Sequence, residues 1–253
     1  MEIYRENLKE KRPVLLQGAM ESEVCRLIAH LDDAREEVLC GYSFYTGSYR
    51  GYPVIVQKTL QGMTNAAAAT MLAIEHHLPS LIINQGICGG HSPALHRGDI
   101  LLGQEIMNYS NFKVGITEHS NPLLGCEAIG CETFSGKVAL FYSDSALVRI
   151  AQSCNHPVDG SNILTGKISS ADAWLDRKDL ISLMHETFGS CGEDMETASV
   201  AQICHMHDIP LLSVRMLSNT RVHDEEYDES VADCVQQFTL RVLDKILEDV
   251  IAG

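Results

Sequence analysis

The 253-residue chain lacks the features that mark membrane-spanning and nucleic-acid-binding proteins. No apolar run approaches the roughly 20 residues that a membrane-spanning helix requires. Basic residues are scarce, with 19 Lys and Arg against 34 Asp and Glu, so the formal net charge is −15. Because nucleic acids and anionic membranes repel so acidic a chain, we expect neither of them as a partner.

Paired cysteine motifs are missing, although the chain contains nine cysteines. Their number is odd, their spacing is irregular and no Cys-x-x-Cys pair occurs, so neither a disulfide framework nor a zinc site is indicated. The first segment, Met1 to Arg12, is charged throughout, unlike a signal peptide. We therefore expect a cytoplasmic protein whose thiols stay reduced.

Several common catalytic motifs are also absent: the Gly-x-Ser-x-Gly elbow, His-Glu-x-x-His, the Walker loop and the dinucleotide-binding Gly-x-Gly-x-x-Gly. The glycine-rich segment 84–90 does not open a helix, as a dinucleotide-binding loop would. We therefore expect no cofactor and no metal, and a reaction that side chains carry out alone.

The chain does contain strand and helix patterns that mostly alternate. Strands are predicted at 13–16, 42–49, 54–58, 80–84, 98–102, 162–168 and 211–217, and helices at 24–31, 63–74, 144–154, 178–188, 198–206 and 229–251. This order predicts an α/β fold with a mixed or parallel central sheet flanked by helices. No linker divides the chain, so we expect one domain over 1–253, with a polar extension at 1–12.

The most informative stretch runs from Glu193 to Asn219, and it reads as an acidic cluster, a helix and a buried strand. Arg215 interrupts that strand, and a charge inside a buried strand needs a partner; Glu196 is one natural candidate. The strand ends on Ser218-Asn219-Thr220. Ligands of open α/β sheets bind at this carboxyl end.

Other strand ends carry further candidates, each with two interpretations. Glu21 and Glu23 follow the Gly18 turn in the first turn of a predicted helix, where carboxylates serve either as caps or as functional groups. Trp174, the one tryptophan, is either a core residue or an aromatic wall against a flat ligand. An aromatic wall with carboxylates and no cofactor motif suits cleavage of an N-glycosidic bond, which needs a carboxylate to activate water.

Six segments together resemble the nucleoside phosphorylase and nucleosidase superfamily, most closely the 5′-methylthioadenosine/S-adenosylhomocysteine nucleosidases. They follow the family's order and span residues 14 to about 220: Gly18-Ala19-Met20-Glu21-Ser22-Glu23-Val24, Ile83-Asn84-Gln85-Gly86 with Gly89-Gly90, Gly98-Asp99-Ile100, Ser170-Ala171-Asp172-Ala173-Trp174, Asp194-Met195-Glu196-Thr197 and Val214-Arg215-Met216-Leu217-Ser218-Asn219. The resemblance implies a three-layer α/β sandwich around a twisted mixed sheet, a purine nucleoside as substrate, and a homodimer.

The resemblance also implies roles for individual residues. Glu23 would activate the attacking water, Glu196 would bind the ribose hydroxyls beside Met195, and Arg215 would orient the water or Glu196. Trp174 would stack on the purine, and the backbone of Leu175 would read the base edge. The remaining substrate-binding positions that it implies are Ser218, Ala19, Ile87 and Gln61.

Water rather than phosphate is the expected nucleophile. Phosphorylases of the superfamily carry arginines where this chain has Asn84 and the acidic run Glu21 to Glu23. A phosphate dianion would meet negative charge there, and no guanidinium fork.

Three positions depart from the nucleosidase pattern. Asn219 replaces the aspartate that protonates the purine, and an asparagine cannot act as a general acid. Ile87 replaces a small hydroxyl residue near the attacking water, and Gln61 replaces an apolar residue of the 5′ pocket. Two alternatives therefore stay open beside an adenine nucleosidase: a 6-oxopurine nucleosidase, and a weakly active or non-catalytic nucleoside-binding relative.

Overall fold

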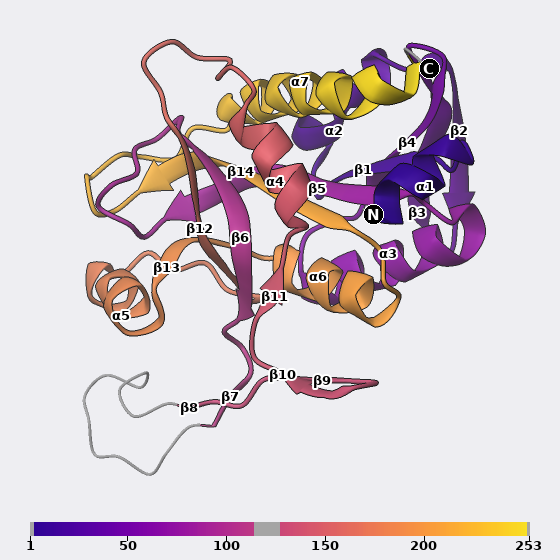
Figure 1. Ribbon diagram of the computed structural model, residues 1–253. Coiled ribbons are helices and arrows are strands. Elements are labelled where there is room, and N and C mark those ends of the chain that lie inside the picture. The colour runs from indigo at the N-terminus through magenta and orange to yellow at the C-terminus, as the bar shows by residue number, and fades with distance from the viewer. Residues whose placement is uncertain (1–2, 114–126, 252–253) are drawn as a thin grey trace.

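The computed structural model describes residues 3–113 and 127–251, shown in Figure 1. The helices are α1 (Ile3–Lys9), α2 (Glu21–Ala29), α3 (Met63–His77), α4 (Ser145–Gln152), α5 (Lys178–Phe188), α6 (Thr197–Met206) and α7 (Val231–Ile251). The strands are β1 (Val14–Gly18), β2 (Asp32–Leu39), β3 (Tyr42–Tyr49), β4 (Tyr52–Lys58), β5 (Leu81–Gly90), β6 (Ile100–Asn108), β7 (Phe112–Lys113), β8 (Glu127–Ala128), β9 (Cys131–Thr133), β10 (Gly136–Val138), β11 (Phe141–Tyr142), β12 (Ile163–Ser170), β13 (Ser190–Asp194) and β14 (Leu211–Thr220).

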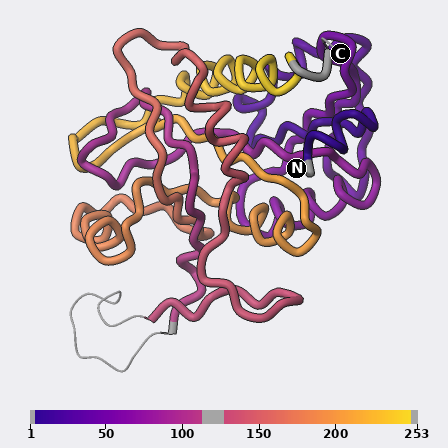
Figure 2. Tube along the Cα trace, viewed as in Figure 1, coloured from indigo at the N-terminus to yellow at the C-terminus, as the bar shows by residue number. Residues whose placement is uncertain are grey.

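The main sheet has the order β11-β6-β12-β13-β5-β1-β4-β3-β2, and β14 pairs with both β5 and β6. The strands β4, β1, β5 and β14 run parallel, whereas β13 pairs antiparallel with β5, so the sheet is mixed. Because β14 bridges β5 and β6, the strands β5, β14, β6, β12 and β13 close into a ring. Figure 2 shows the early strands β1 to β4 at one end of the sheet and this ring at the other.

Helices cover both faces of the sheet, which confirms the predicted three-layer α/β sandwich. On β1, Val14 and Leu16 pack into a core with α1, α2, α4 and α7, whereas Leu15 packs into a second core with α3 and α6. Figure 1 shows the same division, with α2, α4 and α7 on one side and α3 and α6 on the other. Successive residues of a strand point to opposite faces, so a continuous apolar run serves both cores.

The polar extension predicted for residues 1–12 is wrong for the part that the structure describes. Ile3–Lys9 form α1, and its Tyr4 and Leu8 are fully buried in the core of the α2 and α7 face. The Tyr52 hydroxyl lies 2.9 Å from the Leu8 carbonyl and 2.8 Å from the Arg12 carbonyl, and its single hydrogen bonds to one of them at a time, which fixes the helix to β4. Two apolar residues at helical spacing are enough to anchor an otherwise charged segment.

Seven strands were not predicted, and two of them, β2 and β13 of the main sheet, are acidic. The residues of β2 are nearly all exposed at the edge of the sheet, and β13 contains Glu193 and Asp194 of the acidic cluster. The segment 108–132 was predicted as an irregular lid or partner-facing loop. Its residues 114–126 lie outside the described part. Its described ends form β7, β8 and β9, which project from the sheet together with β10 (Figure 1).

Within the described ranges, no helix is both long enough and apolar enough to cross a membrane. The cysteines described there are all free thiols.

Candidate active site

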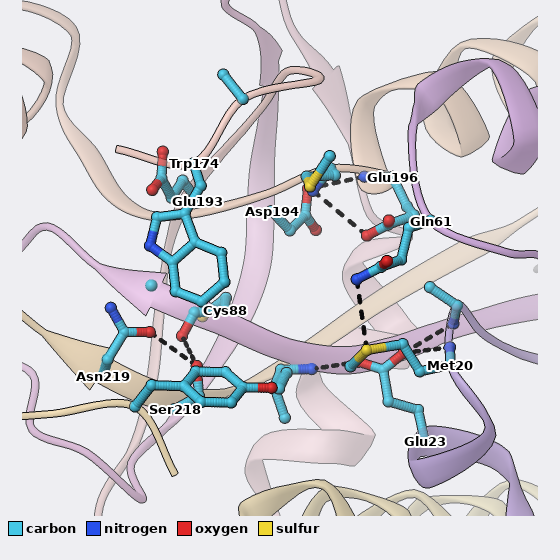
Figure 3. Close-up of a pocket in the computed structure, with 16 residues that line it drawn as sticks. Met20, Glu23, Gln61, Cys88, Trp174, Glu193, Asp194, Glu196, Ser218 and Asn219 are labelled. Atoms are coloured by element: carbon cyan, nitrogen blue, oxygen red, sulfur yellow. Dashed lines mark hydrogen bonds between the residues drawn. The ribbon is translucent and has the colours of Figure 1, made fainter. Parts of the chain in front are cut away.

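An open cavity lies where β1, β5, β13 and β14 end, and it encloses about 580 Å³ including its mouth. Sixteen residues line it: Ala19, Met20, Glu23, Gln61, Ile87, Cys88, Gly89, Ala173, Trp174, Glu193, Asp194, Met195, Glu196, Ser218, Asn219 and Tyr227. Figure 3 shows Glu23 and Met20 at one end of the cavity and Asn219 and Ser218 at the other.

Glu23 is a buried carboxylate held by backbone donors. Its Oε2 accepts the N–H groups of Ala19 (2.7 Å) and Met20 (3.0 Å), and its Oε1 accepts the N–H of Ile87 (2.9 Å). Burial raises the pKa of Glu23 above its ordinary range, although these donors and the nearby Arg215 charge lower it. A carboxylate that is fixed in this way and made more basic by burial can take a proton from a bound water.

Gly86 makes room for this carboxylate. A Cβ at Gly86 would lie 2.4 Å from Glu23 Oε1, closer than any real contact allows. The glycine therefore lets the Glu23 side chain reach the N–H of Ile87 on β5, which joins α2 to the sheet at the cavity.

Glu196 stands at the start of α6. Its Oε1 accepts the N–H of Gly62 (2.9 Å), and its Oε2 lies 3.3 Å from the N–H of Met195. Burial, followed by the Asp194 charge, raises the pKa of Glu196 to about 8, while Arg215 lowers it. A carboxyl group whose pKa lies near neutral pH is largely uncharged there. It can accept hydrogen bonds from ligand hydroxyls at a small cost in desolvation.

Arg215 lies behind the cavity rather than in its lining, and only 2% of its surface is exposed. Its Nε donates to Asp194 Oδ2 at 2.7 Å, not to Glu196 as expected from the sequence. Nη1 donates to the carbonyls of Asn84 and Val214, and Nη2 donates to Asn84 Oδ1 at 2.6 Å. Arg215 therefore acts on the site through its charge and through Asp194.

Asn219 and Ser218 form the polar end of the cavity. The Ser218 hydroxyl lies 2.9 Å from Asn219 Oδ1 and 3.1 Å from the Cys88 carbonyl, and its single hydrogen serves one of them at a time. The Asn219 amide nitrogen points away from Ser218 and towards Gly89 (Figure 3). This end of the cavity thus offers a hydrogen-bond donor to a ligand.

Two aromatic rings stand at the mouth. Trp174 is 59% exposed, and its ring lies 5.5 Å from that of Tyr227, tilted by 53°. The exposure excludes the core interpretation of Trp174. On the far side, Gln61 Nε2 lies 3.5 Å from Met20 Sδ, so this wall combines an amide with a thioether.

Glu193 is a second buried carboxylate in the lining, and the sequence did not single it out as part of the site. Its Oε1 accepts the Leu175 N–H (2.8 Å), and its Oε2 accepts the Tyr109 hydroxyl (3.1 Å). His91 Nε2 lies 3.6 Å from the same Oε2. The backbone donor of Leu175, predicted to read the base edge, is therefore already occupied.

Nine of the eleven predicted site residues line the cavity together: Ala19, Glu23, Gln61, Ile87, Trp174, Met195, Glu196, Ser218 and Asn219. Arg215 and Leu175 do not. The lining residues that the prediction missed are Met20, Cys88, Gly89, Ala173, Glu193, Asp194 and Tyr227. Nothing in the sequence signals Tyr227, which comes from the connection before α7.

Comparisons with known proteins agree with this geometry. The family described as the Phosphorylase superfamily matches residues 13–252. A 5′-methylthioadenosine/S-adenosylhomocysteine nucleosidase of Bacillus thuringiensis (strain Al Hakam) is 27% identical over 235 residues, covering 90% of this chain and 97% of its own.

Solved structures show the same similarity. The 5′-methylthioadenosine/S-adenosylhomocysteine nucleosidase of Colwellia psychrerythraea 34H, in complex with adenine, superposes with a TM-score of 0.78 at 25% identity, over 92% of this chain and 95% of that one. The Neisseria meningitidis enzyme, bound to methylthio-immucillin-A, superposes with a TM-score of 0.77 at 22% identity, over 92% and 98% of the two chains.

Proposed function

Because the chain belongs to the Phosphorylase superfamily, we propose that it hydrolyses the N-glycosidic bond of a purine nucleoside, as 5′-methylthioadenosine/S-adenosylhomocysteine nucleosidases do. The products are the free base and a 5-substituted ribose. The observation that carries the proposal is the Glu23 carboxylate, buried in a cavity that contains no Lys or Arg side chain among its sixteen lining residues.

The bonds change as follows. Glu23 takes a proton from a water molecule, whose oxygen forms a bond to C1′ of the ribose while the bond from C1′ to the purine nitrogen breaks. The electron pair of that bond stays with the base, which gains a proton from solvent because Asn219 has none to give. Glu196, beside Met195, holds the ribose hydroxyls, and Trp174 covers the face of the base.

The charge of the lining supports water as the nucleophile. Four acidic side chains line the cavity, from Glu23, Glu193, Asp194 and Glu196, and the raised pKa of Glu196 leaves the other three to carry most of the negative charge. The nearest guanidinium, that of Arg215, is occupied by Asp194, Asn84 and Val214. A phosphate dianion would be repelled here and would find no bidentate partner.

Asn219 favours a second candidate, hydrolysis of a 6-oxopurine nucleoside. The amide can donate one hydrogen bond and accept another, which suits both the oxygen and the ring nitrogen of such a base. The reaction and the water-activating residue stay the same in this candidate, and only the base changes.

The decisive experiment incubates the purified protein with methylthioadenosine, S-adenosylhomocysteine, adenosine, inosine and 5′-thioinosine analogues, with and without phosphate. Free base is followed by chromatography. We expect base release at the same rate in both buffers. Base release that required phosphate would contradict the proposed hydrolysis. Saturable binding of a nucleoside without base release over hours would identify a nucleoside-binding protein instead.

Three further expectations accompany this function: one domain over the whole chain, a homodimer, and a cytoplasmic location. They follow from the absence of a linker, from the family resemblance and from the reduced cysteines. Sedimentation equilibrium tests the dimer, and a single thermal transition tests the single domain.

A further inference from the structure

Three buried amide side chains, here called the amide row, lie side by side across the sheet: Gln57 on β4, Gln17 on β1 and Asn84 on β5. In the register of these parallel strands, Gln17 stands opposite Gln57 on one side and opposite Asn84 on the other. None of the three is more than 1% exposed. A buried amide costs free energy unless it is hydrogen-bonded, so a row of three in the core needs a reason.

The amide row forms a continuous chain of hydrogen bonds. Gln57 Nε2 donates to the Ala69 carbonyl of α3 at 2.8 Å, and Gln17 Nε2 donates to Gln57 Oε1 at 2.8 Å. Asn84 Nδ2 lies 3.4 Å from Gln17 Oε1, and Asn84 Oδ1 accepts from Arg215 Nη2 at 2.6 Å. The chain therefore runs from α3 to the guanidinium behind the cavity.

The two ends of this chain allow one orientation of each amide. The Arg215 guanidinium can only donate, so Asn84 turns its oxygen towards it and its nitrogen towards Gln17. The Ala69 carbonyl can only accept, so Gln57 turns its nitrogen towards it and its oxygen towards Gln17. Gln17 in the middle satisfies both neighbours, and hydrogen bonds that all point one way polarise one another.

The guanidinium at the end of the chain is held from two sides. On the β13 side, Arg215 Nε donates to Asp194. On the β5 side, Asn84 accepts Nη1 with its carbonyl and Nη2 with its side chain. Four titratable groups act on the charge that is held in this way: Glu23, Cys88, Asp194 and Glu196.

Two of these groups are the carboxyl groups that the reaction uses. Burial raises the pKa of Glu23 and of Glu196, and the Arg215 charge lowers both. We propose that the amide row positions Arg215, and that it thereby sets the positive charge which these two carboxyl groups experience. The inference rests on the function proposed above and adds positioning residues that lie outside the cavity.

The amide row also ties Arg215 to a second partner of Glu196. The N–H of Gly62, just before α3, donates to Glu196 Oε1 at 2.9 Å, and the amide row meets the same helix at Ala69. Glu196 thus contacts a donor and senses a cation whose separation the amide row fixes.

The test is a titration of Glu196 in the whole protein without a nucleoside. Protein labelled with ¹³C at the glutamate carboxyl carbon is titrated by NMR, and the Glu196 signal is assigned by its absence in Glu196→Gln. In Gln17→Leu, Asn84 loses its acceptor and can turn its nitrogen towards Arg215, which pushes the guanidinium away. The pKa of Glu196 should then rise by about one unit. An unchanged or lowered pKa would overturn the inference.

A double variant separates positioning from stability. Gln17→Leu leaves Gln57 Oε1 without its donor, and Gln17→Leu/Gln57→Leu removes that orphaned acceptor as well. The double variant should therefore unfold at a higher urea concentration than Gln17→Leu, while its Glu196 keeps the raised pKa. If the titration returned to that of the wild type together with the stability, the amides would serve only the fold.

Two fully buried threonines provide a matched control. Thr70 on α3 and Thr239 on α7 each donate to the carbonyl four residues earlier, at 2.7 Å and 2.9 Å. Thr70 in addition accepts from Gln17 Nε2 at 2.9 Å. Thr70→Val should raise the pKa of Glu196 by less than Gln17→Leu does, and Thr239→Val should leave it at the wild-type value. Equal shifts in both threonine variants would contradict the role of the amide row.

Catalysis is a separate readout. If the proposed hydrolysis holds, kcat/KM for base release should fall by about tenfold or more in Gln17→Leu, because a small displacement of positioned groups slows a reaction strongly. Wild-type kcat/KM in that variant would overturn the inference and leave the hydrolysis standing. If the wild type itself released no base, the hydrolysis would fail, and the NMR titration would still decide whether the amide row positions Arg215.

Discussion

Arg215 Nε lies 2.7 Å from Asp194 Oδ2, and both side chains are almost completely buried. The pair joins β14 to β13 inside the ring of strands. A buried ion pair contributes little when it is intact, but its loss leaves an uncompensated charge.

Arg215→Met should therefore reduce the free energy of unfolding by about 3–5 kcal/mol. Urea denaturation measures the loss. Arg221→Met is the matched control, because Arg221 pairs with Asp176 and Glu226 at the surface, where about 1 kcal/mol or less is expected. Adding Asp194→Asn to Arg215→Met should recover part of the loss. Equal losses of unfolding free energy in the two arginine variants would contradict the larger effect expected for the buried pair.

Glu23→Gln should lower base release by about 10²–10⁴-fold, because an amide cannot accept the proton of water. The folded amount should stay the same, as judged by circular dichroism. Glu21 lies in the same helical turn but pairs with Lys58 at the surface. The Glu21→Gln variant should therefore release base at a rate within about twofold of the wild type. Comparable activity in the two variants would remove Glu23 from the reaction.

The pH dependence of stability should carry the signature of Glu196. Its pKa is about 8 in the folded protein and 4.5 ordinarily. Between these values the folded state holds a proton that the unfolded state has released. Stability is therefore lost as pH rises through this window and levels off above it.

Glu196→Gln cannot lose that proton, so its Tm should fall less than the wild-type Tm between pH 5 and pH 8, by several degrees. Thermal melts at constant ionic strength measure the difference. Glu186→Gln, which is exposed, should follow the wild type. Parallel curves for the wild type and Glu196→Gln would show that Glu196 ionises normally.

Asn219→Asp should raise base release from adenine nucleosides by at least about tenfold, since a carboxyl group can supply the proton that the departing base needs. Asn155→Asp, at an exposed position outside the cavity, is the control for an added charge. No gain in a folded Asn219→Asp protein would mean that this side chain does not meet the purine ring nitrogen.

The sequence predicted the fold wherever periodicity was strong. Lys178–Phe188 and Tyr42–Tyr49 have the predicted bounds, and the continuous apolar run of β14 is buried on both faces. The prediction from sequence missed strands whose residues are mostly charged, because they lack the apolar pattern of a buried strand. The exposed edge strand β2 is mostly polar because an edge facing water needs no apolar face and benefits from charges that prevent further pairing.

Most of the residues proposed for the site line one cavity, but their hydrogen-bond partners were not predicted. Arg215 was correctly placed in a buried strand, yet Asp194 and Glu196 are two residues apart in the chain, and only the path of β13 decides which one it meets. Leu175 was assigned a backbone contact that Glu193 takes, a side chain 18 residues away. Such pairings depend on the register between β12, β13 and β5, which local sequence patterns do not encode.

The pairing of β14 with both β5 and β6 has a consequence for local opening of the molecule. Where β14 is hydrogen-bonded on both sides, at Val214 to Met216, it cannot fray from an edge, so we expect those amides to exchange with solvent only when larger units unfold. All ten residues of β14 are buried, and the strand ends on Ser218 and Asn219. In hydrogen-exchange terms, we therefore expect the polar end of the cavity to follow directly on a slowly exchanging part of the chain, so that the ligand meets donors whose positions are set before it binds.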